Sequence, residues 1–503
     1  MEMGGEKLKY VTTGTNNKII DINTSLIERI KIIKPENTYT LNDKGNGELF
    51  ADLFKNLCRF NVTAKEWYCY DGKVWTEDMG GMIASRYAKE LSDALLIYVT
   101  TIQEETRRSV YLKHVANLGQ LRYRNTMLQD ARDKYFISSD NLDKDPYLFN
   151  CQNGTIDLKT FHFKPHNSDD LLSKVSNVWY EAGTKSLPFE KFMNEVMEDK
   201  VDKIEYLQKL LGYSLTGETR EETCFILYGN STRNGKSTLV ETIAYMLGNT
   251  QGYAMNMKPE TLAQKQNNDS RQASGDIARL KGCRFLNASE PARRMLFDVG
   301  LLKTLLGRDS ITARHLHERE IQFYPEFKLF INCNSLPLVN DETLFTSGRI
   351  NVITFDKHFS PEEQDKGLKE RLRSRESISG IFNFCLEGLR KYYLEGVEPP
   401  LTVKEATNDY QLQSDKIGNF INEVLKKSER NSKAGDIYKV YSDWCRSNGY
   451  GVENKGNFFA ELKTKGLYKP TGTVNGCTVK NVVIGYDIDN WIMVENEKIV
   501  PFD

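Results

Sequence analysis

One segment of the chain joins a strongly apolar strand to a helix through a short loop that contains two glycines. The segment reads CFILYGNSTRNGKSTLVETIAYML, in which Cys224–Tyr228 is the strand and the helix begins near Lys236. An apolar strand followed at once by a helix is typical of a parallel sheet that helices cover on both faces. This segment therefore predicts an α/β fold for the central part of the chain.

The loop of this segment has the chemistry of a phosphate-binding site. Backbone N–H groups at a helix N-terminus attract phosphate, Lys236 adds a positive charge, and the Ser237 hydroxyl can bind Mg²⁺. A chance GKST sequence at an ordinary helix start is the alternative, and the strand–loop–helix context argues against it. We expect ATP to contact ten residues: Gly229, Asn230, Ser231, Thr232, Arg233, Asn234, Gly235, Lys236, Ser237 and Thr238.

The glycine spacing of this loop is unusual. The standard pattern has a glycine at position 230, but Asn230 stands there and the glycine comes one residue earlier, at Gly229. The departure affects the details of the loop and leaves the class of site unchanged.

Three more apolar strands follow, and each adjoins a polar residue suited to ATP hydrolysis. Glu290 comes after the strand at 283–288 and is the candidate to hold Mg²⁺ and polarise the attacking water. Asn334 ends the next strand, where its amide could sense the γ-phosphate. Arg349 precedes the third strand and is the candidate arginine finger for the ATP of a neighbouring subunit. Each residue has an alternative role. Glu290 could be an ordinary surface glutamate, Asn334 could merely start the Asn-Ser-Leu-Pro turn, and Arg349 could form a structural salt bridge.

Between the strands of Glu290 and Asn334, the sequences ITARHL and REIQFYP predict a hairpin with a polar tip. We expect Arg314, His315, His317 and Arg319 of this hairpin to contact DNA phosphates in the pore of a ring. Zinc is less favoured, because the two histidines lie on one face of a strand without a third ligand. A plain solvated hairpin is the other alternative.

The chain up to about residue 185 mixes helical periodicity, as at Ile83–Thr101, with short strand-like pieces. EWYCYDGKVW, YLFNCQNGTIDLKT and FHFKP predict strands, with glycine turns in the first two. Trp67 and Trp75 could stack on bases, but aromatic residues at alternating strand positions are more often core residues. We therefore predict that both are buried. The paired acids and His-rich strand of a primase are not evident here.

The chain ends in a small domain with a local excess of positive charge. Helical spacing at 437–444, a second helix in NKGNFFAELKTKG and a β-type tail predict a winged helix. Residues 430–486 contain nine Lys or Arg and four Asp or Glu, which favours DNA. We expect Lys455, Asn457, Lys463 and Lys465 to contact phosphates and grooves at an origin. A protein-interaction module with a solvated lysine face is the alternative.

The composition is that of a folded protein of several domains, with 39% apolar and 27% charged residues. Because the net charge is −1, any contact with nucleic acid must come from local patches or a lined channel. The nine cysteines form no CxxC pair, which suits reduced core thiols better than disulfides or a zinc site. No apolar run approaches the roughly 20 residues that span a bilayer. We therefore expect a cytoplasmic protein with no membrane partner.

The order of these motifs resembles superfamily 3 helicases of phages, plasmids and mobile islands, which are related to the poxvirus NTPase-primase. The resemblance covers roughly residues 45 to 500. It implies an AAA+-like motor that forms homohexamers, binds ATP and Mg²⁺ between subunits, and moves 3′ to 5′ on single-stranded DNA. The stretches that carry it are GYSLTGETREETCFILYGNSTRNGKSTL, LKGCRFLNASE, GRDSITARHLHEREIQF, KLFINCNSLP and SGRINVITF, and upstream NGTIDLKTFHFKPHNSDDLLSKV.

The resemblance also implies roles for single residues. Lys236 and Ser237 match the Walker A pair, Glu290 matches the Walker B acid, Asn334 matches sensor 1, and Arg349 matches the finger. Ser289 replaces the first acid of the acidic pair that several relatives carry. One carboxylate is therefore left to serve both the metal and the water.

The expected architecture is multidomain α/β. Its parts are an uncertain segment 1–45, an α+β domain 46–185, a helical collar with the AAA+-like ATPase 186–400, a helical linker 401–431, and the winged helix 432–503. We expect an ATP-dependent hexameric DNA helicase that loads itself at the replication origin of a mobile element, where it could meet host replication proteins. The alternatives are an ATP-switched origin-binding protein that does not unwind, and the helicase half of a primase-helicase.

Overall fold

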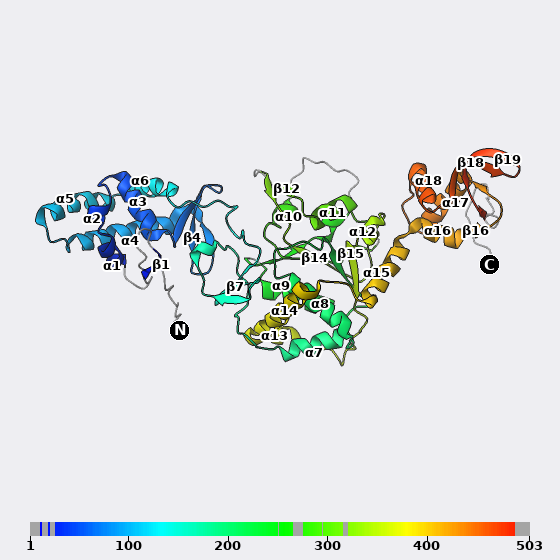
Figure 1. Ribbon diagram of the computed structural model, residues 1–503, viewed down its shortest axis with the longest axis horizontal. Coiled ribbons are helices and arrows are strands. Elements are labelled where there is room, and N and C mark those ends of the chain that lie inside the picture. Colours follow the sequence, from blue (N-terminus) through cyan, green and yellow to red (C-terminus); the bar gives the residue numbers. More distant parts are fainter. Residues whose placement is uncertain are drawn as a thin grey trace.

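The computed structural model describes residues 26–249, 251–264, 275–293, 295–314 and 320–487, together with the backbone of the paired strands β1 (Val11–Thr12) and β2 (Ile19–Ile20). These residues form an elongated molecule with an N-terminal lobe at one end, a central lobe, and a C-terminal lobe at the other end (Figure 1). No helix among the described residues has the length and apolar character to cross a membrane.

The N-terminal lobe packs helices against a small antiparallel sheet. Its elements are α1 (Leu26–Ile33), α2 (Pro35–Thr38), α3 (Asp43–Phe54), β3 (Cys58–Asn61), β4 (Glu66–Tyr70), β5 (Trp75–Asp78), η1 (Met79–Gly81), α4 (Met82–Val99), α5 (Glu105–Ala116), η2 (Asn117–Gly119), α6 (Leu121–Asp130) and η3 (Ala131–Asp133). The Asp78 carboxylate accepts hydrogen bonds from the backbone N–H groups of Ile83 and Ala84. These groups lie in the first turn of α4 and would otherwise have no hydrogen-bond acceptor within the helix.

The two tryptophans of this lobe are core residues. Trp67 is 5% exposed and Trp75 is 1% exposed, so the prediction that they are buried is confirmed. Trp67 contributes to the hydrophobic cluster of α3 and α4, where its ring lies 5.9 Å from that of Phe50. Neither tryptophan is available to stack on bases.

A second antiparallel sheet leads into the central lobe. It contains β6 (Leu148–Cys151), β7 (Gly154–Asp157) and β8 (His162–Lys164), and η4 (Ser168–Asp170) follows it. The strands coincide with the predicted pieces. Their apolar side chains belong to the core of the central lobe, where the ring of Phe149 stacks 5.0 Å from that of Phe382.

The central lobe is built on a five-stranded parallel sheet. Its strand order is β10-β11-β14-β9-β15. The bounds are β9 (Cys224–Tyr228), β10 (Ala254–Met257), β11 (Phe285–Ser289), β14 (Lys328–Cys333) and β15 (Ile350–Thr354). Four of these strands are the predicted apolar runs. The fifth, β10, was not predicted, because its four residues AMNM include no β-branched or aromatic side chain.

Helices surround this sheet. They are α7 (Leu187–Val196), α8 (Val201–Tyr213), α9 (Lys236–Leu247), η5 (Pro259–Leu262), α10 (Gly275–Ala278), α11 (Val299–Leu306), α12 (Thr343–Thr346), α13 (Leu368–Leu372) and α14 (Arg375–Glu395). Helices α8 and α14 approach so closely that a β carbon at Gly388 would stand 1.9 Å from the Gln208 carbonyl oxygen. The predicted hairpin is present as β12 (Ile311–Ala313) and β13 (Ile321–Phe323), which pair antiparallel.

Helix α15 (Leu401–Ser414) packs against β15 and leads to the C-terminal lobe (Figure 1). The predicted pair of helices and the strand hairpin are present in this lobe. Its core includes the rings of Phe420, Tyr441, Trp444 and Phe458. The elements are α16 (Lys416–Val424), β16 (Lys426–Lys427), β17 (Ser432–Lys433), α17 (Ala434–Ser447), α18 (Lys455–Thr464), β18 (Tyr468–Val474), β19 (Cys477–Val483) and β20 (Tyr486–Asp487).

Candidate nucleotide site and DNA contacts

The loop between β9 and α9 is held in one conformation by its own glycine and by the chain that follows β15. Gly235 has φ 85°, and a β carbon there would stand 2.4 Å from Cγ1 of Val196, so only glycine fits. The backbone N–H of Phe359 donates to the Arg233 carbonyl at 3.0 Å. Nδ1 of His358 lies 2.9 Å from the Thr232 carbonyl oxygen.

The ten predicted loop residues differ in exposure. Gly229, Asn234 and Lys236 are buried, Ser231, Gly235 and Thr238 are half-buried, and Asn230, Thr232, Arg233 and Ser237 are exposed. Within the loop, the Asn234 amide donates to the Ser231 carbonyl at 2.7 Å. The buried members therefore shape the loop, whereas the exposed members are open to a ligand.

Lys236, the first residue of α9, meets Asn334 from the neighbouring strand. Its Nζ lies 2.9 Å from Oδ1 of Asn334 and 3.4 Å from the Gly229 carbonyl oxygen. The residue is 3% exposed, and burial lowers its pKa, although Cys333 and the Glu290 carboxylate act against that shift. Both hydrogen-bond partners are neutral, so the ammonium lacks the anionic partner that a buried cation needs.

Glu290 and Ser237 lie at the same edge of the sheet. Glu290 directly follows β11, and its backbone N–H donates to the Asn332 carbonyl at 2.7 Å. The Asn332 amide in turn donates to Oγ of Ser237 at 3.4 Å. Strands β11, β14 and β9 are parallel neighbours, so their carboxyl ends bring these residues together.

A cleft of about 650 Å³ opens beside this edge and is lined by Ser237, Glu290 and Asn332. Ser289 also lines it and accepts a hydrogen bond from Asn287 at 2.8 Å. The oxygen atoms of Ser237 and Glu290 are the ligand type that Mg²⁺ prefers. The donor set therefore fits this ion.

Sequence reasoning missed most of the other residues that line the cleft, among them Asn332 and Arg373. The sequence did contain a signal for Asn332, because a polar amide within the apolar run KLFINC becomes a buried amide in the strand. Arg373 had none, because the packing of α13 brings it to the cleft from far along the chain. Its guanidinium lies 3.8 Å from Glu241 and 5.1 Å from the centre of the Tyr245 ring.

Arg349 lies away from this site. Its carbonyl oxygen accepts from Cys224, at the start of β9, whereas the phosphate loop follows the end of β9. Its Nη2 lies 2.8 Å from a carboxylate oxygen of Glu222, and Nη1 lies 3.5 Å from the Lys303 carbonyl oxygen. Within one chain, Arg349 thus forms the salt bridge that was its alternative role.

The predicted DNA contacts of the hairpin are described only in part. Arg314 follows β12, whereas His315, His317 and Arg319 lie outside the described residues. In the C-terminal lobe, Nζ of Lys455 lies 5.5 Å from the centre of the Tyr438 ring.

The other predicted contacts of the C-terminal lobe lie on or next to α18. The backbone N–H of Asn457 donates to the side chain of Asn454 at 2.9 Å, which caps this helix, and Lys463 lies in its last turn. Lys455, Asn457 and Lys463 therefore belong to one helix.

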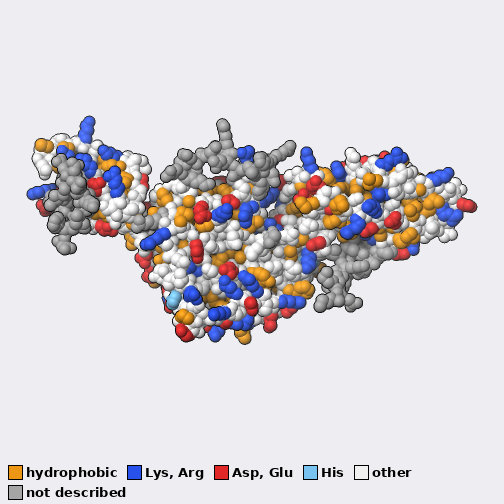
Figure 2. Space-filling view, turned by 180° about the vertical axis from the view of Figure 1, so that it is seen from behind, with side chains coloured by type: hydrophobic (Ala, Val, Ile, Leu, Met, Phe, Trp, Pro, Cys, Tyr) orange, Lys and Arg blue, Asp and Glu red, His pale blue; other side chains and the backbone are white. Residues whose placement is uncertain are grey.

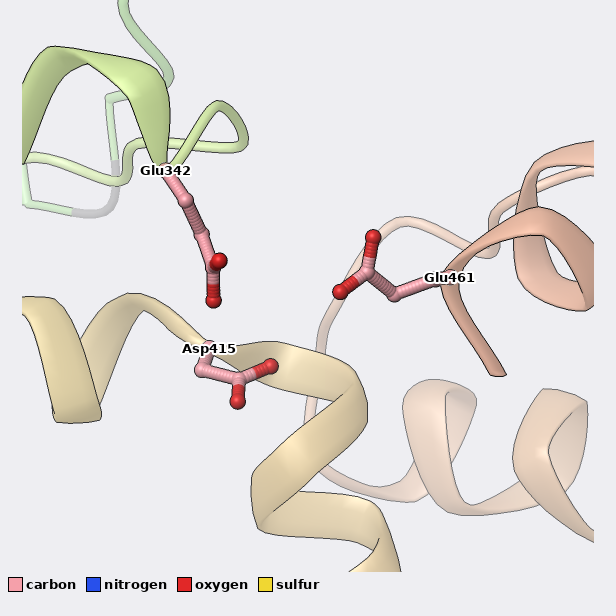
Figure 3. Close-up of side chains that lie close together, drawn as sticks. All are labelled: Glu342, Asp415 and Glu461. Carbon is pink, nitrogen blue, oxygen red and sulfur yellow. The ribbon is translucent and has the colours of Figure 1, made fainter. Parts of the chain in front are cut away.

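Lys465 has a different set of partners. Figure 3 shows the carboxylates of Glu342, Asp415 and Glu461 pointing toward one another from the start of α12, the junction of α15 with α16, and α18. Nζ of Lys465 lies 2.7 Å from Asp415, 3.5 Å from Glu461 and 3.9 Å from Glu342. In this arrangement Lys465 forms ion pairs with the three carboxylates. Because Glu342 belongs to the central lobe, the contact also joins the C-terminal lobe to the central lobe.

Comparison with known proteins gives two matching family models. "D5 N terminal like" matches residues 47–198, and a family of unknown function, DUF5906, matches residues 227–349.

Viral proteins are similar over much of the chain. "Putative helicase L207/L206" of Acanthamoeba polyphaga mimivirus is 30% identical over 368 residues, which are 67% of this chain and 37% of that protein. "Putative helicase 022R" of Frog virus 3 (isolate Goorha) is 28% identical over 242 residues, which are 44% of this chain and 24% of that protein. The chain thus spans well under half the length of these two relatives.

Among solved structures, the apo structure of the NrS-1 C terminal region is similar with a TM-score of 0.45 and 10% identity. The match covers 85% of this chain and 96% of that chain.

Proposed function

Because the chain belongs to the superfamily 3-like helicase and primase family of viruses and phages, we propose that it is an ATP-driven DNA helicase that acts in replication. The contact that supports this proposal best is the one between Lys236 and Asn334, 2.9 Å apart beside Glu290 at one edge of the parallel sheet. A buried ammonium with only neutral partners favours an anionic ligand such as the phosphates of ATP.

In the proposed reaction, backbone N–H groups of the loop and Lys236 bind the phosphates of ATP. Ser237 and Glu290 would hold Mg²⁺, which neutralises charge on the phosphates when bound. Glu290 polarises the attacking water, and Asn334 orients that water or the γ-phosphate. Glu290 carries both duties, because the residue before it is Ser289.

The proposal includes a hexameric ring in which Arg349 serves the ATP of the next subunit. Arg349 is at the edge of the sheet opposite its own phosphate loop, so it suits a neighbour's site better than its own. For that role its guanidinium must leave Glu222. Within the ring, the hairpin residues Arg314, His315, His317 and Arg319 would follow one DNA strand, moving 3′ to 5′.

We further propose that the C-terminal lobe is a winged helix that loads the protein at an origin. Helices α17 and α18 with the β18–β19 hairpin support this reading. Lys455, Asn457 and Lys463 would contact DNA from α18. Lys465 would join them only after release from its three carboxylates.

A second candidate function is an ATP-switched origin-binding protein without unwinding. The contact of Lys465 with Glu342 favours it, because that contact joins the C-terminal lobe to the chain just before α12 and Arg349. A change at the nucleotide site could thereby reposition the DNA-binding lobe.

The two functions differ in strand displacement. We would measure ATP-dependent release of a labelled strand from forked duplexes with tails of either polarity, for the wild type and for Lys236→Ala. A helicase should need a 3′ tail, and the variant should lose displacement and ATPase by about 100-fold or more. DNA-stimulated ATPase without displacement on any fork would support the switch, whereas full activity of Lys236→Ala would refute both.

A further inference from the structure

The segment formed by α5, η2 and α6 in the N-terminal lobe carries more positive than negative charge. Residues 106–129 contain five Lys or Arg and no Asp or Glu, and the acids of these helices, Glu105 and Asp130, stand at the two ends of the segment. The whole chain, by contrast, balances 68 Lys and Arg against 69 Asp and Glu. Helix α5 lies at the outer end of the molecule, away from the central lobe (Figure 1). Figure 2 shows Lys and Arg side chains (blue) at this end, together with some Asp or Glu side chains (red). This surface is therefore a local basic patch on a chain that is nearly neutral.

Three cations of this patch are not neutralised. Lys113 and Arg122 are exposed and Arg108 is half-buried, and no carboxylate of the described chain forms an ion pair with any of them. Arg107 differs, because its Nε lies 3.5 Å from Glu104. We call Arg108, Lys113 and Arg122 the α5–α6 surface.

The patch is held in place by its fifth cation. Nη1 of Arg124 donates to the carbonyl oxygens of Leu118 at 2.8 Å and Gly119 at 2.7 Å. These bonds fix η2, which joins α5 to α6, so the two helices keep their positions. The apolar faces of both helices are buried at Tyr111 and Met127.

Arg122 is oriented for a phosphate. Its guanidinium lies over the Tyr123 ring at 4.6 Å from the centroid, and Nη2 donates to the Tyr123 hydroxyl at 3.1 Å. Stacking on an aromatic face leaves other N–H groups of the guanidinium free to donate in its plane. The same contact covers the Tyr123 ring, and Tyr111 is buried, so neither tyrosine of the patch offers a free face to a base.

We propose that the α5–α6 surface binds the phosphate backbone of double-stranded DNA. Cations with no carboxylate partner suit a polyanion, and the absence of a free aromatic face favours a duplex over single-stranded DNA, whose bases need stacking partners. The inference rests on the proposed function in that DNA is the substrate. It adds a contact outside the motor, at the far end of the molecule.

The test compares two triple variants of the full chain. One is Arg108→Gln, Lys113→Gln and Arg122→Gln. The control is Lys31→Gln, Lys44→Gln and Arg86→Gln, which removes the same charge from the same lobe but from residues that each have a Glu partner on their own helix. The affinity for a labelled duplex is measured by fluorescence anisotropy over a range of salt concentrations.

We expect the first variant to bind the duplex about tenfold more weakly, with a salt slope smaller by about 2.7, since each lost phosphate contact removes about 0.9. The control should bind like the wild type, and ATPase without DNA should be unchanged in both. Equal affinity and slope in the two variants would overturn the proposal. Unchanged DNA binding with altered self-association would also overturn it and would assign the patch to a protein contact.

This result is separable from the proposed function. If Lys236→Ala abolishes ATPase while the first variant binds DNA normally, only the α5–α6 surface is refuted. If Lys236→Ala retains ATPase while the first variant loses DNA affinity, the proposed motor is refuted and the DNA contact stands.

Discussion

Lys236 and Asn334 show how one contact between neighbouring strands prepares a site. Each residue follows an apolar strand, and the parallel pairing of β9 with β14 places their side chains 2.9 Å apart. Glu290 follows β11, on the other side of β14. A cation, an amide and a carboxylate thus meet at one edge without lying close in the sequence.

At this scale we predict that Glu290→Gln separates ATP binding from hydrolysis. The substitution keeps the side-chain size and an oxygen that can face Mg²⁺ but removes the negative charge that polarises water. The kcat should therefore fall by about 100-fold or more, a larger effect than the change in affinity for ATP. Steady-state ATPase and binding of a fluorescent ATP analogue measure the two quantities. Glu241→Gln is the control, because Glu241 lines the same cleft but pairs with Lys369. Equal kcat in the Glu290 variant and the wild type would remove Glu290 from the mechanism.

Two buried cations join elements of the central lobe. Nζ of Lys328, at the start of β14, donates to the carbonyl oxygens of Glu218 at 3.0 Å and Glu326 at 3.1 Å, and also to Thr216. Arg284, just before β11, donates to the carbonyl oxygens of Leu215 and Leu148. These bonds hold the chain between α8 and β9, and also β6, against the sheet that carries the site.

We predict that Lys328→Met destabilises the fold, because buried carbonyl oxygens would lose their donor. A loss of about 2 kcal/mol in the free energy of unfolding is expected from leaving such groups unsatisfied. Urea unfolding monitored by circular dichroism measures it. Lys281→Met is the matched control, since Lys281 is only half-buried and pairs only with Asp140 in the described chain. Equal unfolding midpoints for both variants would contradict a structural role for Lys328.

For the whole molecule, the position of the C-terminal lobe depends on the contacts of Lys465. Burial acts against protonation, but Asp415, Glu461 and Glu342 together raise the pKa of Lys465. A raised lysine pKa stabilises the docked arrangement at every pH below the usual lysine pKa, and this contribution is lost as the pH rises through the raised value. The docked lobe is therefore stable at neutral pH.

We predict that Lys465→Ala frees the C-terminal lobe. Loss of the bonds to three carboxylates should increase the radius of gyration measured by small-angle X-ray scattering. It should also speed protease cleavage near the α15–α16 junction by about tenfold, as expected for the loss of a charged hydrogen bond worth about 1.5 kcal/mol. Lys463→Ala, two residues away and without these partners, should behave like the wild type. Identical scattering for the two variants would show that Lys465 does not hold the lobe.

Local patterns in the sequence determined much of the fold and part of the candidate site. Continuous apolar runs predicted β9, β11, β14 and β15, because a strand buried on both faces needs apolar side chains throughout. Alternation predicted that Trp67 is buried, and turn chemistry predicted the β12–β13 hairpin. The phosphate loop was evident because its glycine, lysine and serine are consecutive.

Other features depend on residues far apart in the chain and follow from the packing of the fold. The partners of Lys465 come from three separate elements, and the sequence alone gave no reason to remove it from the DNA contacts. Arg349 was placed at the edge opposite its own loop by the pairing of β15 with β9, and Arg373 reached the cleft through the packing of α13. Local propensity indicates which elements form, but the position of a side chain relative to distant residues depends on how those elements pack.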